Sequence, residues 1–600
     1  MLRSKNESTP AHVRLLVPTW LQIVAWGMGL AACLLGMLEW IAEWQSPVAT
    51  LELLALAIAP IIFMWPTRRR ASDESGRAVQ TANRADFLIS LLLGGLSFGI
   101  CFSAGHELEN QPPAYHDEFS YLFQAQTLLR GRLTFPSHPT HPELFDQMHV
   151  LNEGRMASRY YPGTGLWLAP FVALRIPYWA SWTAAAVSTV LIYWIGRELG
   201  TRLTAIIAAL SAALSPGICL FSNTLLSHPA SMVSLMVFLL GAVRWERTRG
   251  TRDAIMAGTG LSLAMLCRPM TAAAIGLPFG VDVLWWLLGK TCPSGQVIGK
   301  KEWRGTLLGY GVPLLLGWSM MLTYNHAVTS DWLMSPYQLY TNIYTPRHVY
   351  GFNNVIRGEQ RLGPKVLDAY DRRWAENLTP ELAARNELVR WLASWIWTFD
   401  ILPLLICSTI FLGMWRVQDR CWKLIFLAIV SLHIVHVPYW YVGIMGWHYV
   451  FESAPLWCLI VGLVTTELAG TWRAQGKPGL TIWWLSLLLA IMLANHVSAA
   501  GFWKPRLQRG LNPLQHPRRV HAELRNWIEE RVKRPALVLL EQPSEESHLD
   551  LVVNQPGLSS DILMGRFRAG QTDVHQVRRD FPDRHVYVAN PEQRSIREIE

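Results

Sequence analysis

Long apolar runs alternate with short polar stretches along most of the 600 residues. A helix needs about 20 apolar residues to cross the bilayer core. Runs of that order, some of them shorter, lie at residues 15–37, 51–65, 87–104, 178–195, 203–220, 230–243, 254–267, 271–288, 306–323, 391–414, 422–440, 449–466 and 481–499. The pattern predicts an all-α polytopic membrane protein with about 13 transmembrane helices.

The order of these runs predicts three parts. Residues 1–86 are expected to form an N-terminal cytoplasmic tail and two extra transmembrane helices, and residues 87–500 a transmembrane core with large outer loops at about 105–177 and 324–390. In residues 501–600 the strings "PALVLL", "LDLVVN" and "HVYVAN" are typical of short strands among helices. We therefore expect a small soluble α/β domain at the C-terminus, on the extracytoplasmic side.

Composition and charge support this organisation. The chain is 51% hydrophobic and only 16% charged, which is less charge than a soluble protein of this size carries. The net charge of +9 does not predict nucleic-acid binding, because its Lys and Arg gather in alternate short loops, as the positive-inside rule requires. These loops hold Arg68–Arg70, Arg244–Arg252, Lys290–Arg304, Arg416–Lys423 and Arg473–Lys477.

Loop charge also predicts sidedness. With a cytoplasmic N-terminus, the third helix ends outside, and the loops at 223–228, 324–390 and 446–449 lie on the same face. Lys504 and Arg506 follow the last helix, where the rule prefers the inside, but long domains are less bound by it. We expect a multi-pass protein of the cell inner (plasma) membrane whose active face is extracytoplasmic.

An acidic pair stands in "AYHDEFSYLFQAQTLLRGRLTFP", just beyond the third helix. Apolar residues at helical spacing follow Asp117 and Glu118, which predicts a helix lying in the membrane interface. One interpretation is structural, because carboxylates stabilise helix N-termini. The other is functional, with the pair exposed to a substrate on the outer face. The stretch alone leaves both open.

Further ionisable and aromatic residues are predicted on the same outer face. An ionisable residue at membrane depth is costly and indicates a functional site. The candidates for substrate binding lie beside the acidic pair, in "SRYYPGTGLWL", in "LLSHPASM", in "LCRPM", in "SPYQLYTNIYTPRHVYGF" and in "GWHYVFESAP"; they are His116, Arg159, Tyr160, Tyr161, His228, Arg268, Tyr340, Arg347, His448 and Tyr449. The alternatives are headgroup contact by Arg159, a topology signal at Arg268 and an aromatic belt formed by the tyrosines.

In the order of these strings the chain resembles the polytopic GT-C glycosyltransferases, near the protein O-mannosyltransferase and lipid A aminoarabinose transferase branch. "HDEFSYLFQAQTLLRGRL" is similar to the family's acidic motif and following helix, and "SRYYPGTGLWL" to its basic, Tyr- and Pro-containing string. The resemblance covers about residues 104–499. It implies a GT-C-like fold and an inverting transfer of a sugar from a polyprenyl-phosphate carrier to an acceptor hydroxyl or phosphate.

The resemblance also implies residue roles. Asp117 matches the catalytic acidic position, which makes it the expected base, with Glu118 orienting Asp117 or the acceptor. Arg159 and Arg268 match basic positions that contact the carrier phosphate, as Tyr449 matches a phosphate-contacting tyrosine. Arg347 and His348 fall in a loop that varies in the family. The expected partners are the lipid-linked sugar donor and an envelope glycan, lipid or protein acceptor, without nucleic acid.

One departure from the family pattern concerns a metal. Many relatives have a second acidic residue in the next outer loop, but here that loop offers Asn223 and His228. A divalent cation is therefore left open as a cofactor, and no cofactor is assigned. His228 is either a ligand, a hydrogen-bonding group or a histidine that caps a helix.

Two other classes remain as alternatives. A transporter or flippase for a lipid-linked sugar would also be polytopic with buried arginines, although such proteins more often show paired repeats with broken helices near the midplane. A non-catalytic scaffold of an envelope complex would not need the acidic pair. Transfer of sugar from a polyprenyl-phosphate donor distinguishes the three.

Overall fold

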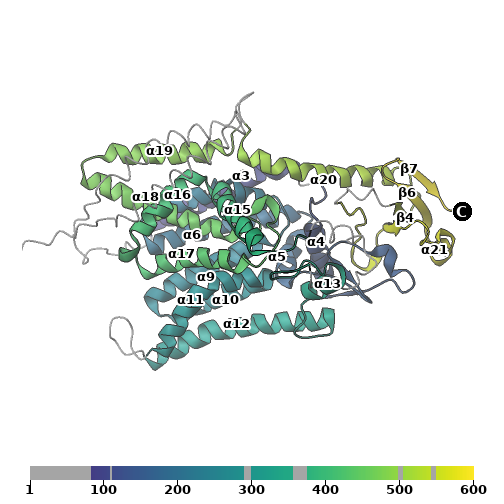
Figure 1. The fold of residues 1–600 in the computed structure, drawn as a ribbon, viewed down its shortest axis with the longest axis horizontal. Helices are drawn as coiled ribbons and strands as arrows, with labels where there is room; N and C mark the ends of the chain where they lie inside the picture. The colour runs from purple at the N-terminus through teal and green to yellow at the C-terminus, as the bar shows by residue number, and fades with distance from the viewer. Residues whose placement is uncertain (1–82, 109–110, 290–298, 356–374, 498–503, 542–548) are drawn as a thin grey trace, which may run out of the picture.

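The computed structural model describes residues 83–108, 111–289, 299–355, 375–497, 504–541 and 549–600, and its long helices lie side by side as a bundle (Figure 1). The apolar runs predicted at 15–37 and 51–65 lie outside the described residues. The helices are α3 Arg84–Gly105, α4 His116–Leu129, α5 Pro162–Ala173, α6 Pro177–Leu199, α7 Arg202–Ala213, α8 Pro216–Phe221, α9 His228–Thr248, α10 Thr251–Cys267, α11 Pro269–Leu288, α12 Lys300–Thr329, α13 Pro336–Tyr344, α15 Pro380–Thr398, α16 Ile401–Gly413, α17 Arg420–His436, α18 Ala454–Ala474, α19 Pro478–Ala494, α20 Arg506–Glu529 and α21 Val574–Asp580.

Five described helices are long and apolar enough to cross a membrane: α3, α9, α11, α12, and α18 together with the short turn Phe451–Ser453 before it. The pair α15 and α16, bent by 105° at its break, would add a sixth. The predicted count of about thirteen is not confirmed. One reason is that the run at 203–220 forms two shorter helices, because Ser215 and Pro216 end α7 and begin α8.

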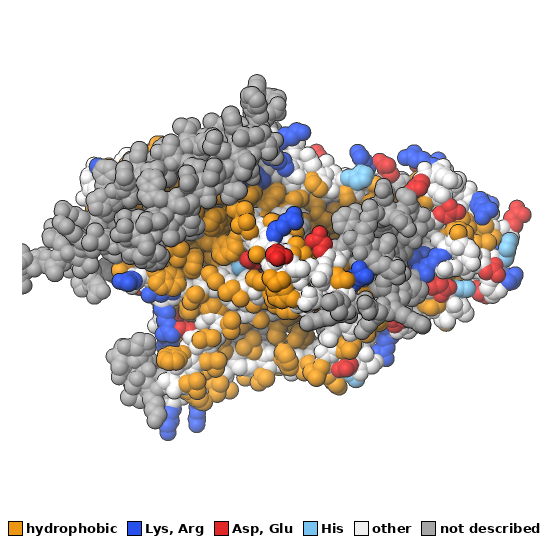
Figure 2. All heavy atoms as spheres, viewed as in Figure 1, with side chains coloured by type: hydrophobic (Ala, Val, Ile, Leu, Met, Phe, Trp, Pro, Cys, Tyr) orange, Lys and Arg blue, Asp and Glu red, His pale blue; other side chains and the backbone are white. Residues whose placement is uncertain are grey.

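The surface of the bundle fits a lipid environment. Figure 2 shows hydrophobic side chains over most of the helical part of this face, whereas charged side chains are more numerous at the end that holds the C-terminal strands. Large apolar residues on candidate spans are exposed, including Leu92 at 72%, Trp285 at 75% and Leu315 at 66%. Exposed apolar residues of this size are costly in water, so these surfaces are suited to contact with lipid.

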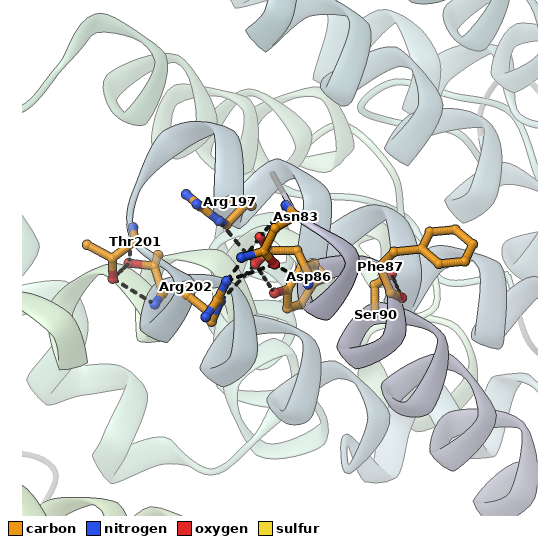
Figure 3. Close-up of polar contacts among 9 residues, drawn as sticks. Asn83, Asp86, Phe87, Ser90, Arg197, Thr201 and Arg202 are labelled. Carbon is orange, nitrogen blue, oxygen red and sulfur yellow. Dashed lines mark hydrogen bonds and ion pairs between the residues drawn. The ribbon is translucent and has the colours of Figure 1, made fainter. Parts of the chain in front are cut away.

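An ion cluster at the start of α3 ties this exposed helix to the bundle (Figure 3). The buried carboxylate of Asp86 lies 2.9 Å from Arg202 Nε and 3.3 Å from Arg197 Nε, and it accepts a hydrogen bond of 2.8 Å from Tyr193. A buried carboxylate is tolerated when it is paired in this way. The cluster therefore connects α3 to α6 and α7 at the end opposite the acidic pair.

Two small sheets cover the other end. The segment between α4 and α5, which the sequence predicts as the first outer loop, holds a three-stranded antiparallel sheet of β1 Phe135–Pro136, β3 Arg155–Ser158 and β2 Val150–Asn152. The C-terminal sheet has the order β5 Ile562–Phe567, β4 Ala536–Glu541, β6 His585–Asn590, β7 Ser595–Glu598, with β7 antiparallel to β6 and the other pairs parallel. The C-terminal module is thus a mixed sheet with α20 and α21. The predicted strings "PALVLL" and "HVYVAN" form β4 and β6, whereas "LDLVVN" at residues 549–554 is not a strand.

The C-terminal sheet and the first outer loop share a hydrophobic core. Leu537 and Leu539 of β4 lie in one cluster with Leu144 and Phe145 of the loop and with Phe123 of α4. The opposite face of the sheet packs against the end of α20. In Figure 1 α20 runs from the helical bundle to this sheet, with α4 and α13 between the bundle and the strands. The C-terminal residues therefore rest directly on the segment that carries the acidic pair.

Candidate active site

Glu118 performs the structural role that the sequence left open for the acidic pair. It is fully buried, and its Oε1 accepts hydrogen bonds from the backbone N–H groups of Ala114 (3.1 Å) and Tyr115 (3.0 Å). Its Oε2 accepts a third, of 2.7 Å, from the N–H of Leu225. A Glu at the third helical position that reaches back to the cap residue is the acidic half of a capping box. Glu118 thus fixes the first turn of α4 against the next outer loop.

Asp117 faces a different environment. About a third of its side chain (31%) is exposed, its Oδ1 accepts a hydrogen bond from Tyr160, and its Oδ2 lies 3.8 Å from His149 Nε2. Burial raises the pKa of Asp117, but His149, the Tyr160 hydrogen bond, His448 and Arg159 lower it, and the result lies below the usual value. Asp117 is therefore an ionised carboxylate with solvent access.

His149, which the sequence did not indicate, connects Asp117 to Arg159. It adopts a left-handed backbone conformation with φ 62°, which is unfavourable for a residue other than Gly. Its N–H donates to Tyr340 Oη (3.0 Å), and its carbonyl oxygen accepts from Ser120 Oγ (2.6 Å) and Arg159 N–H (3.1 Å). Such strained positions cluster at functional sites. These three hydrogen bonds fix the backbone of His149 in this conformation.

Arg159 is a buried cation that lies among aromatic rings. Only 3% of it is exposed, and its guanidinium carbon lies 4.0 Å from the ring centre of Tyr337 and 4.3 Å from that of Tyr340. Its Nη2 donates to Thr341 Oγ1 at 3.1 Å. Within the described part of the chain, no carboxylate oxygen lies within ion-pair distance of Arg159, and its Nε has no hydrogen-bond partner. The charge is stabilised by π-systems rather than by a direct anion.

The contact between Arg159 and His149 determines the histidine tautomer. Arg159 Nη1 lies 3.2 Å from His149 Nδ1. Because a guanidinium does not lose its proton, Nδ1 must accept this hydrogen bond, and the proton of the neutral imidazole is on Nε2, towards Asp117. Burial lowers the pKa of His149 to about 3, with Arg159 acting in the same direction and Asp117 against it. The carboxylate, the imidazole and the guanidinium form one continuous polar cluster.

Arg268 is the centre of a second group of side chains, in which a carboxylate compensates its positive charge. Its Nε lies 3.1 Å from Glu452 Oε1, and its other nitrogens lie 3.0 Å from His228 Nε2 and 3.3 Å from the carbonyl oxygen of His448. Glu452 is fully buried. A sequence signal for it existed, because a carboxylate inside the apolar run "VFESAP" is unusual at membrane depth.

A metal at His228 is not favoured by these contacts, since a guanidinium beside Nε2 repels a cation. Within the part of the chain that the structure describes, no group of three or more His, Cys, Asp and Glu side chains is arranged to hold a metal ion. Asn223, from the same outer loop, is used structurally: its Oδ1 accepts from Trp182 at 3.0 Å and its Nδ2 donates to the carbonyl of Cys219 at 2.9 Å.

A row of tyrosines joins the two groups. Tyr449 donates to Tyr439 at 3.4 Å, and the hydroxyls of Tyr439 and Tyr337 are also 3.4 Å apart. Tyr337 stacks on Arg159, while Tyr449 follows His448, whose carbonyl oxygen contacts Arg268. Strings that the sequence predicts on the outer face, and that are far apart in the sequence, thus meet in one place.

The remaining candidates are His116, Tyr161 and Arg347. His116 Nε2 accepts a hydrogen bond of 3.2 Å from the N–H of Asp550 in the C-terminal module. Tyr161 caps α5 and contacts Ser335. Arg347 lies in the loop after α13, where its carbonyl oxygen accepts a bond of 2.8 Å from Asn354.

Comparisons with known structures give similar helical proteins. The chain is similar to ArnT from Cupriavidus metallidurans in the apo state, with 11% identity and a TM-score of 0.48 over 84% of this chain and 93% of that one. Against the same protein bound to undecaprenyl phosphate, the identity is 12% and the TM-score 0.47, over 85% of this chain and 91% of that one. The oligosaccharyltransferase of Archaeoglobus fulgidus matches with 11% identity and a TM-score of 0.43 over 68% of this chain, which spans about half (55%) of its length.

No family model matches the chain, and no curated protein sequence matches it.

Proposed function

We propose that this chain is an inverting membrane glycosyltransferase that moves a sugar from a polyprenyl-phosphate carrier to an acceptor hydroxyl or phosphate. The acceptor belongs to an envelope glycan, lipid or protein, and the reaction takes place on the outer face of the membrane. Asp117 is the base in this proposal. The class of carrier is the one that the resemblance of the sequence strings implies. The site geometry supports the roles proposed for the residues.

The observation that carries the proposal is the pairing of a partly exposed carboxylate with a buried arginine that lacks a carboxylate partner among the described residues. The guanidinium of Arg159 is suited to bind an anion, because a guanidinium binds phosphate by strong, often bidentate, hydrogen bonds. Asp117 stands two contacts away through His149. A site that must bind a lipid phosphate and deprotonate an acceptor needs a cation and a carboxylate close to each other.

The chemical step follows from these positions. The acceptor oxygen attacks the anomeric carbon while the bond from that carbon to the carrier phosphate breaks. The acceptor proton passes to Asp117, and the carrier leaves as polyprenyl phosphate with its new charge next to Arg159. A positioned base contributes roughly 10²–10⁴ in rate, and preorganised donors at the leaving group add a separate electrostatic contribution.

Other residues support donor binding in this scheme. Tyr160 orients Asp117 through its hydrogen bond, and Tyr449 lies in the tyrosine row that leads from Arg159 to Arg268. Arg268 is a second cation near the carrier phosphate, but its pairing with Glu452 gives it less free charge than Arg159. Glu118 positions the first turn of α4 rather than contacting substrate.

The test is the release of free polyprenyl phosphate. Purified protein is given a polyprenyl-phosphate sugar and an extract of envelope acceptors, and both free carrier and labelled sugar in the acceptor fraction are measured. The proposal predicts equal amounts of the two products. A flippase would relocate the donor without breaking its glycosidic bond, so intact donor and no free carrier would contradict the proposal.

A further inference from the structure

Arg518 is charged but fully buried, and it lies on a helix whose exposed face is polar. The buried residues of α20 include Leu507, Gly510, Leu514, Arg518 and His521, which are spaced three or four apart and lie on one face. The next residue, Arg519, is 68% exposed and pairs with Glu523 one turn away. Burial of a cation is costly unless the surroundings compensate it. The C-terminal helix α20 therefore positions Arg518 at a specific site in the protein interior.

Arg518 lies next to Glu118 of the acidic pair and next to the turn at residues 223–225. Arg518 Nη2 donates to the carbonyl oxygen of Asn223 at 2.7 Å and lies 3.9 Å from Glu118 Oε2, and the guanidinium lies 5.0 Å from the ring centre of Tyr178. Glu118 Oε2 also accepts from Leu225. Arg518 and Glu118 therefore both hydrogen-bond to the same turn, at residues 223–225.

We propose that Arg518 is a positioning residue for the active site, which acts through Glu118 and rests on the proposed function. With Arg518 in place, Glu118 keeps its three backbone hydrogen bonds, so the first turn of α4 presents Asp117 to the substrate. The C-terminal module is thus part of the catalytic unit and not an appendage.

Removal of Arg518 has a direct chemical consequence. Burial raises the pKa of Glu118 above its usual value, and Arg518 is the cation that opposes this effect most. Loss of Arg518 removes this opposing charge and raises the pKa of Glu118 further, and movement or protonation of the carboxyl group weakens its acceptance of the N–H groups of Ala114, Tyr115 and Leu225. A shift of the first turn displaces Asp117, and misplacement of about 1 Å costs up to 10²-fold in rate.

The test is a cycle of four proteins: wild type, Glu118→Gln, Arg518→Met and the double variant, with Arg519→Met as the matched control. Arg518→Met is expected to lower kcat roughly 10- to 100-fold with less change in KM for the donor, because Arg159 is not touched. Arg519→Met leaves both values unchanged. Arg518→Lys restores part of kcat, since it keeps the charge.

The cycle separates a positioning role from general loss of structure. On the Glu118→Gln background, Arg518→Met should change kcat very little, because the group through which it acts is already altered. The same factor in both backgrounds would overturn the proposal, as would normal kcat in Arg518→Met. Thermal unfolding of the four proteins tests the pairing without any assay of transfer, and non-additive shifts are expected. Additive shifts overturn the pairing, whereas absence of transfer in the wild type contradicts the proposed function instead.

Discussion

Adjacent carboxylates at the start of α4 face two environments, although the sequence presents them as a pair. Glu118 accepts only backbone hydrogen bonds, whereas Asp117 accepts one from the Tyr160 side chain and lies near His149. The structural and the catalytic interpretation of the pair therefore do not compete, since each describes a different residue.

The lowered pKa of Asp117 predicts the pH dependence of the reaction. Only the ionised carboxylate accepts a proton, so kcat/KM should fall as the pH drops through the pKa of Asp117, which lies below its usual value of 3.8. From about pH 5 to 8 we expect no acid limb from this group. Tyr160→Phe removes a hydrogen bond that favours the ionised form, so the acid limb should move to higher pH.

The measurement is the pH profile of kcat/KM for both proteins. An acid limb near pH 6 in the wild type that does not move in Tyr160→Phe would contradict this assignment, because it would belong to another group.

Arg159→Ala should weaken donor binding more than it weakens the fold. Loss of a charged hydrogen-bond partner costs about 1.5–3 kcal/mol, which corresponds to roughly 10- to 100-fold in Kd. Arg159→Lys should recover part of this, because it keeps the charge but not the planar fork. Binding of polyprenyl phosphate to the purified variants measures the effect. An unchanged Kd in Arg159→Ala would mean that the phosphate binds elsewhere.

At the scale of elements, the first turn of α4 depends on Glu118. Both of its oxygens accept N–H groups, so the NH₂ of a Gln at this position must face at least one donor. Glu118→Gln should therefore lower the stability of the purified protein by about 1–3 kcal/mol. Asp117→Asn should have a much smaller effect, because Asp117 does not cap the helix. Thermal unfolding in detergent compares them, and equal losses would contradict the division of roles.

Apolar periodicity predicted the helices where a run stays continuous. The run at 87–104 lies within α3, and the α/β character of the tail follows from its short strand-like strings. The run at 203–220 predicts one span, although Ser215-Pro216 is a helix-start signal that divides it. Hydropathy averages over such a break, which is one reason why the predicted number of spans is not confirmed.

Sequence patterns also predicted the site only in part. Short motifs in the right order indicated Asp117, Arg159 and Arg268, which the structure places in two groups that a row of tyrosines joins. His149 and Arg518 belong to no local motif, since they reach the site only through contacts between segments far apart in the sequence. Tertiary contacts of this kind are not visible in the pattern of one chain.

For the whole molecule, the proposal requires the C-terminal module and the acidic pair to lie on the outer face. Ser595→Cys places a thiol on β7, and Ala474→Cys places one at the basic loop near Arg473. Cys33 and Cys292 are replaced by Ser in both variants; the described cysteines are buried. An impermeant thiol reagent on intact spheroplasts should label Ser595→Cys and not Ala474→Cys, which should react only after lysis. The reverse pattern would invert the topology.

The most direct measurement for the whole account is the rate of polyprenyl phosphate release by Asp117→Asn at saturating donor. Asn preserves the shape of Asp117 but cannot accept the acceptor proton, so release should fall by roughly 10² or more while the variant still binds donor and accumulates normally. A rate close to that of the wild type, with donor bound to the same extent, would contradict the central claim that Asp117 is the catalytic base.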